Sequence, residues 1–172
     1  MSKNVMQIII LFFVLVLAQI VCYKIMLFGL AVPIVFIYLI LRLPINWHLN
    51  VALTIAFLMG LAVDITCNTP GLNALCCTLL AVFRYPIFSL YVSREDDMNV
   101  PTPSVESLGL GSYFRYMSTM VVIYATMLFF LQSIGMHNLP VTLARIGASS
   151  VLSIALILGL DSLVSTRREK RL

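Results

Sequence analysis

Long apolar runs separated by short polar breaks extend over most of the chain. Several of these runs approach the length of about 20 residues that an α-helix needs to cross a bilayer. We therefore predict an all-α integral membrane protein, a single polytopic domain over residues 1–172 with about six transmembrane helices in one compact bundle. The expected spans are 5–22, 31–43, 49–66, 74–91, 115–133 and 141–164.

The first two runs differ from the others. The run 5–22 follows Lys3 and has no small-residue cleavage site behind it, so we interpret it as a retained anchor and not as a secretory signal. The second run contains Pro33, which is tolerated best at a helix start. A helix over 31–43 is roughly 20 Å long against a bilayer core of about 30 Å, so its length leaves open whether it crosses fully.

The polar breaks predict the connections and the orientation. Thr69, Pro70 and Gly71 are typical of a tight turn, and Asn73 follows where a helix cap belongs. Residues 93–112 form the longest polar loop, and the tail 165–172 is strongly basic. Lys and Arg gather on the side of both termini, so the positive-inside rule predicts that the termini, this loop and the tail are cytoplasmic.

The composition agrees with a membrane protein. The chain is 61% hydrophobic and 10% charged, whereas soluble domains average about 45–50% and 25%. So few charges cannot coat a soluble domain, which excludes soluble, secreted, disordered and nucleic-acid-binding classes. We attribute the net charge of +4 to topology signals, with a contact to anionic lipid or to an acidic cytoplasmic protein as the alternative. The four cysteines show no zinc-binding spacing and are expected to pack as small apolar residues.

Four ionisable residues fall within or near the predicted spans, where each costs about 2.5–3.5 kcal/mol at the bilayer centre. Asp64 and Arg145 fall near the outer ends of their spans, while Arg84 and Asp161 fall near the cytoplasmic ends. We therefore predict two ion pairs, Asp64 with Arg145 and Asp161 with Arg84. Snorkelling of Arg84 and Asp161 to the interface is the alternative.

Small residues recur at helical spacing on the third and fourth spans. The third span carries a stripe that ends in the carboxylate, Ala52, Ala56, Gly60 and Asp64, and the fourth carries Ala74, Cys77, Ala81 and Arg84. Small side chains let helix backbones approach closely where lipid provides no hydrophobic drive for association. We therefore expect these two helices, joined by a tight turn, to form a closely packed antiparallel hairpin.

The segment 43–87 resembles the central hairpin of the rod shape-determining protein MreD family. The resemblance rests on Leu43 and Pro44 at the entry, on the signature Phe57, Gly60 and Asp64, on Gly71 and Leu72 in the turn, and on Ala74 at the head of a long apolar helix. It covers about a quarter of the chain in detail and the remainder by hydropathy.

This resemblance implies a non-enzymatic scaffold of the cell-elongation complex in the bacterial inner membrane, involved in cell shape and in the placement of peptidoglycan synthesis. The implied partners are an MreC-like single-span membrane protein and, through it, an MreB-like filament and peptidoglycan synthases. The helical arrangement is expected to resemble the S-components of energy-coupling factor transporters. Gly60 and Asp64 would act as a helix contact and a buried polar anchor.

Two other functions have sequence features of their own. A membrane-embedded solute-binding component of a vitamin-uptake-type transporter would need convergent polar groups around a pocket, and the candidates are Asp64, Asn68, Asn73 and Arg145. An enzyme is not expected, because neither HExxH nor GxSxG occurs and both histidines lie in interfacial breaks. We expect no cofactor, no metal and no nucleic acid. A docking role for the loop 93–112 stays open.

Overall fold

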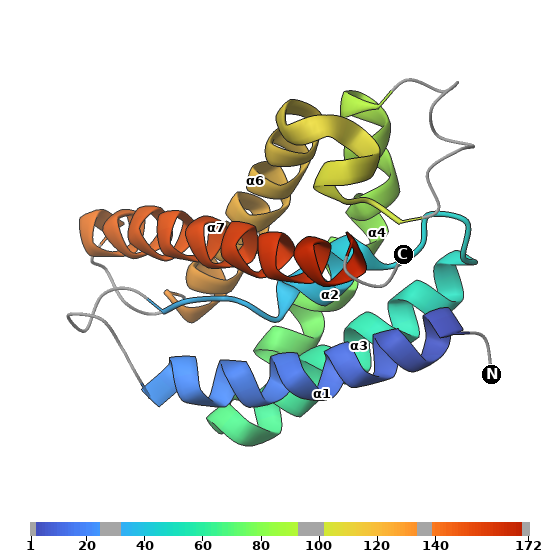
Figure 1. Ribbon diagram of the computed structural model, residues 1–172. Helices are drawn as coiled ribbons and strands as arrows, with labels where there is room; N and C mark the ends of the chain where they lie inside the picture. The colour runs from blue at the N-terminus through green and yellow to red at the C-terminus, as the bar shows by residue number, and fades with distance from the viewer. Residues whose placement is uncertain (1–2, 25–31, 93–101, 134–138, 170–172) are drawn as a thin grey trace.

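The computed structural model describes residues 3–24, 32–92, 102–133 and 139–169 (Figure 1). Within these ranges the chain forms helices and connecting segments and no strand. The helices are α1 (Lys3–Lys24), α2 (Ile37–Arg42), α3 (Leu49–Cys67), α4 (Leu72–Tyr91), α6 (Val105–Gln132) and α7 (Leu139–Glu169). The prediction of an all-α chain is confirmed.

Five of these helices are long and apolar enough to cross a membrane: α1, α3, α4, α6 and α7. Their outward faces carry large exposed apolar side chains, among them Phe13 on α1, Ile65 on α3 and Phe130 on α6. Such side chains would be costly in water but suit a lipid environment. The architecture is that of a multi-pass membrane protein.

The prediction of a helix over 31–43 is wrong. Residues 32–35 are extended, and α2 has only six residues, or about 9 Å of helix (residue 31 lies outside the described residues). Pro33 provides no N–H for a helical bond, and the extended backbone around it bonds to side chains of α1 and α7 instead. The hydropathy of this segment reflects complete burial, because every side chain from Ile34 to Leu41 is at most 3% exposed.

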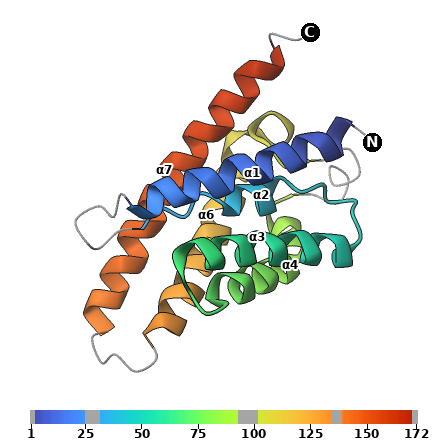
Figure 2. The same ribbon diagram turned by 90° about the horizontal axis from the view of Figure 1, so that it is seen from below.

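The segment 32–44 nevertheless runs from one end of the bundle to the other. Its start is bonded to Gln19, near the end of α1, and its last residues are bonded to Arg84, near the end of α4. Four extended residues followed by about two turns of helix reach roughly 25 Å. Non-helical backbone is tolerated at this depth because it is surrounded by protein. The first residues of α1 and the last of α7 therefore lie at the same end of the bundle (Figures 1 and 2).

The predicted polar loop 93–112 is wrong in its second half. Helix α6 begins at Val105, where Ser104 and Ser107 form a capping box, and Gly109 kinks the helix at a φ of 74°. Capping by serine starts a helix even where the sequence is not yet apolar. Residues 93–101 lie outside the described residues. At the other end, α7 continues to Glu169, so most of the predicted tail is helical, while 170–172 are not described.

Candidate functional site

The α3–α4 hairpin contains the residues on which the family resemblance rests. The predicted stripe residues are all buried: Ala52, Ala56, Gly60, Asp64, Ala74, Cys77 and Ala81. A Cβ added to Gly60 would lie 2.5 Å from the Cα of Ala74 and 2.6 Å from the carbonyl oxygen of Asn73. Since both neighbours are main-chain atoms, no side chain fits here unless the helices separate.

The turn between the two helices uses left-handed backbone twice. Asn68 ends α3 at a φ of 54°, and Gly71 precedes α4 at a φ of 75°. Glycine adopts this conformation without strain, so Gly71 serves as the N-cap residue of α4. The prediction that Asn73 is the cap is therefore wrong: Asn73 is the second residue of the helix, and a side chain from α3 caps it.

That capping side chain is Asp64, which is 3% exposed. One carboxylate oxygen accepts hydrogen bonds from the Thr69 hydroxyl, from the Asn73 backbone N–H at 3.1 Å and from the Asn73 side-chain amide at 2.9 Å. The other oxygen accepts from the Ala74 N–H at 2.8 Å. The carboxylate thus satisfies orphan donors of α4 and faces the positive end of its dipole, which compensates for its burial.

The predicted ion pair between Asp64 and Arg145 is not formed. The two residues lie at the same end of the bundle, but Asp64 is saturated by donors of its own hairpin. The one ion pair among the described residues joins Arg42 to Asp161. The Nε atom of Arg145 is buried and has no hydrogen-bond partner there.

The predicted pair between Asp161 and Arg84 is also wrong. Asp161 accepts a hydrogen bond from the Tyr38 hydroxyl at 2.8 Å and lies 3.7 Å from Arg42. Arg84 donates to the carbonyls of Leu43 at 2.9 Å and Pro44 at 2.7 Å. The carbonyls at the end of α2 lack helical partners and carry partial negative charge, so they bind the guanidinium in place of a carboxylate.

Three polar residues that sequence reasoning missed hold the extended segment. The Gln19 amide bonds both Pro33 O, at 2.9 Å, and Val35 N, at 3.0 Å. Ser149 and Ser153 accept from the N–H groups of Val32 at 3.0 Å and of Ile34 at 2.8 Å. The sequence feature that could have identified them is a polar residue inside an otherwise apolar run. The two serines are also four residues apart, which places them on one face of α7.

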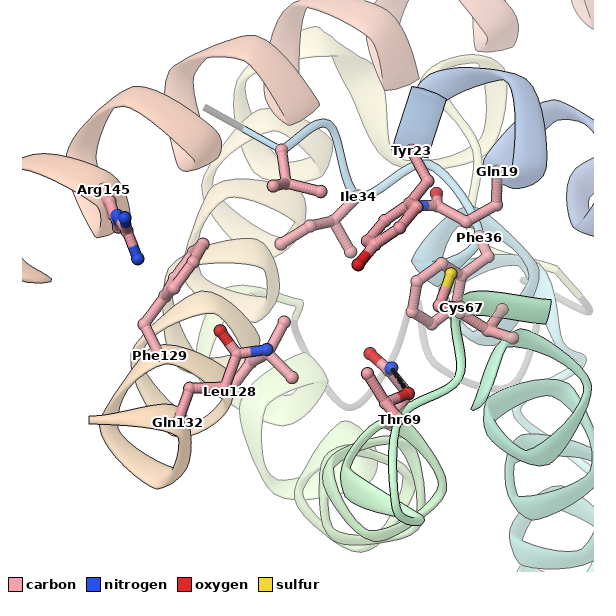
Figure 3. Close-up of a pocket in the computed structure, with 13 residues that line it drawn as sticks. Gln19, Tyr23, Ile34, Phe36, Cys67, Thr69, Leu128, Phe129, Gln132 and Arg145 are labelled. Atoms are coloured by element: carbon pink, nitrogen blue, oxygen red, sulfur yellow. Dashed lines mark hydrogen bonds between the residues drawn. The ribbon is translucent and has the colours of Figure 1, made fainter. Parts of the chain in front are cut away.

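A cavity of about 130 Å³ lies where the ends of α1, α3 and α6 meet the start of α7 (Figure 3). The extended segment and the α3–α4 turn complete its wall. The lining residues are Gln19, Tyr23, Val32, Ile34, Phe36, Val63, Cys67, Thr69, Asn73, Leu128, Phe129, Gln132 and Arg145. Of the predicted polar candidates, Asn73 and Arg145 line it, while Asp64 sits behind Thr69 and Asn73.

Comparison with protein-family models, with curated proteins and with solved structures finds no match for this chain. Within the described residues no group of three His, Cys, Asp or Glu side chains could hold a metal ion. The four cysteines are free thiols. Fold and site together define a multi-pass helical membrane protein with a capped hairpin and a small internal cavity.

Proposed function

We propose that this protein is a non-enzymatic, MreD-like scaffold of the cell-elongation complex in the bacterial inner membrane. The observation that carries the proposal is the role of the two motif residues, because Gly60 permits the backbone contact between α3 and α4 and Asp64 caps α4. A hairpin held at both points is a rigid support, as a scaffold requires.

The partner in this proposal is an MreC-like single-span protein, which in turn links to an MreB-like filament and to peptidoglycan synthases. Apolar faces for a single transmembrane helix are present on α1 and α3. On α1, Phe13 and Leu17 are 63% and 64% exposed, and on α3 Ile65 is 74% exposed. Van der Waals packing on such faces drives helix association in lipid.

The proposal also includes the orientation and the relationship of the fold. The first residues of α1 and the last described residues of α7 lie at one end of the bundle (Figures 1 and 2), and Arg42, at the end of α2, contacts Asp161 in the later part of α7. We propose that this end is cytoplasmic, as the positive-inside rule predicts from the sequence. A similarity to the S-components of energy-coupling factor transporters is part of the proposal, as the family resemblance implies.

Deleting the gene in its own rod-shaped host and complementing it tests the scaffold. We expect rounded cells without the protein, rescue by the wild-type chain, and no rescue by Asp64→Leu. A photo-crosslinking residue at Phe13, Leu17 or Ile65 should capture an MreC-like protein from living cells. Normal cell shape after deletion, together with no captured single-span protein from any of the three positions, would contradict the proposal.

A solute-binding transport component is the second candidate, and the cavity favours it. Such a function needs a pocket with apolar walls and a few polar groups, and this cavity, between the end of α1 and the start of α7 (Figure 3), is lined by both kinds of side chain. Purifying the protein in mild detergent discriminates the two candidates: a stoichiometric small molecule supports transport, and a stoichiometric single-span protein supports the scaffold.

A further inference from the structure

The polar groups around the cavity fall into two sets, those already hydrogen-bonded and those without a partner. The Gln19 side-chain amide donates a hydrogen bond to the Pro33 carbonyl and accepts one from the Val35 N–H. Asn73 donates to Asp64 and Thr69 and accepts from Tyr124 at 2.7 Å. The Thr69 hydroxyl donates to Asp64. These groups build the wall and leave little capacity for a ligand.

Three lining side chains have no hydrogen-bond partner among the described residues: Tyr23, Gln132 and Arg145. Figure 3 shows Tyr23 of α1 and Gln132 of α6 pointing toward the cavity, and Arg145 of α7 at its edge, beside Phe129. All three can donate hydrogen bonds, and among the described residues that line the cavity Arg145 carries the one formal charge. A guanidinium that is partly buried and has no partner for its Nε atom is costly, and an anion would relieve this cost.

Asp64 does not neutralise this charge locally. Its oxygens accept hydrogen bonds from Thr69, Asn73 and Ala74, and of these residues Thr69 and Asn73 line the cavity while Asp64 does not. Apolar side chains lie among these donors, with Leu128 beside Gln132 and Phe36 beside Tyr23 (Figure 3). The site therefore combines a cationic donor set with an apolar wall.

The wall also includes the extended segment, whose N–H groups at Val32, Ile34 and Val35 are bonded by side chains. Membrane proteins tolerate non-helical backbone at this depth where it is buried or lines a cavity. Here it does both, since Ile34 is buried and also lines the cavity, and hydrogen bonds to Gln19, Ser149 and Ser153 fix its backbone in place of a continuous helix.

We propose that this cavity binds one oxyanion, a carboxylate or phosphate, attached to a small apolar body, with Arg145 as its counter-charge. The cavity of about 130 Å³ is comparable to the engineered cavity of about 150 Å³ that admits benzene, so the enclosed part of the ligand is no larger than a six-membered ring. The inference rests on the solute-binding candidate for its site and is independent of the scaffold proposal. The same chemistry is offered by a soluble organic acid and by an anionic lipid headgroup.

Binding of benzoate to the full chain in phosphatidylcholine nanodiscs tests the site, with uncharged benzamide as the matched probe. Calorimetry is expected to detect benzoate and not benzamide. Arg145→Gln should weaken benzoate binding roughly tenfold or more, because a charge-assisted hydrogen bond is lost. Arg115→Gln, which removes an exposed charge on α6, is the control and should bind as the wild type does.

A second arm identifies the source of the anion. If a lipid headgroup occupies the cavity, adding phosphatidylglycerol to the nanodiscs weakens benzoate binding by wild-type protein, and this competition disappears in a Tyr23→Phe, Gln132→Leu double variant. If a soluble acid is the ligand, phosphatidylglycerol has no effect. Equal binding of benzoate by wild type and Arg145→Gln, equal binding of benzamide, or no binding of benzoate at millimolar concentration overturns the proposal.

The same variants test the scaffold proposal separately, by photo-crosslinking and by rescue of cell shape. Arg145→Gln is expected to keep the photo-crosslink to a single-span partner and to rescue cell shape, so loss of anion binding and loss of scaffolding are distinguishable outcomes.

Discussion

Asp64 and Arg145 lie at the same end of the bundle, yet their surroundings are opposite. The carboxylate accepts from four donors supplied by its own hairpin, whereas the guanidinium Nε has no partner among the described residues. Hydrogen bonds offset the desolvation cost of a buried charge, whereas a buried charge that is left unpaired costs stability. The comparison therefore assigns Asp64 to architecture and leaves Arg145 for a ligand.

The largest effect is expected from Asp64→Leu. This change leaves the N–H groups of Asn73 and Ala74 without acceptors in the interior, at about 1–3 kcal/mol for each orphaned group. We expect a large fall in the denaturation midpoint in detergent, or no accumulation in membranes. A midpoint equal to that of the wild type would remove the distinction between the two charges.

Gly60→Ala comes next, at about 1–3 kcal/mol of lost stability, because its Cβ would press on the backbone of Ala74. The matched control is Gly147→Ala on α7, where an added Cβ meets nothing within 4 Å. Alanine is the better helix former, so this control should be neutral or stabilise by up to about 1 kcal/mol. Equal midpoints for the two variants, measured by the same thermal unfolding, would show that the hairpin contact is not tight.

Ser153→Ala tests the support of the non-helical segment 32–35, whose residues Val32 and Ile34 line the cavity. The buried N–H of Ile34 loses its acceptor, at a cost of about 1–3 kcal/mol. Ser89→Ala on the exposed face of α4 serves as the control and should stay within about 0.5 kcal/mol of wild type. Hydrogen exchange should also rise in residues 32–36 of the Ser153 variant, and unchanged exchange there would argue that the serine is dispensable.

The smallest effect on stability is expected from Arg145→Gln. Since Arg145 forms no hydrogen bond or ion pair with the described residues and an unpaired charge is removed, the free energy of unfolding without ligand should not fall and should stay within about 0.5 kcal/mol of wild type. The same measurement in benzoate should show stabilisation of the wild type alone. A strong loss of stability without ligand would place Arg145 with Asp64 as an architectural charge.

Prediction from the sequence succeeded where local pattern decides the outcome. Apolar runs of sufficient length located five helices, and the small-residue spacing placed Gly60 and Asp64 on the face of α3 that meets α4. It failed for residues 31–43, since hydropathy reports burial and a segment enclosed by protein is as apolar as one enclosed by lipid. It failed again for both ion pairs, because a list of charged side chains omits the backbone groups that compete for them.

The sequence by itself determined the membrane class, the long helices and the tight turn, since these depend on residues close together in the chain. Tertiary structure alone decided that Asp64 caps α4, that Arg84 binds the carbonyls ending α2, and that Gln19, Ser149 and Ser153 hold an extended crossing segment. The physical reason is that each buried polar group takes the nearest unsatisfied partner, and which partner is nearest is settled only when distant helices pack together.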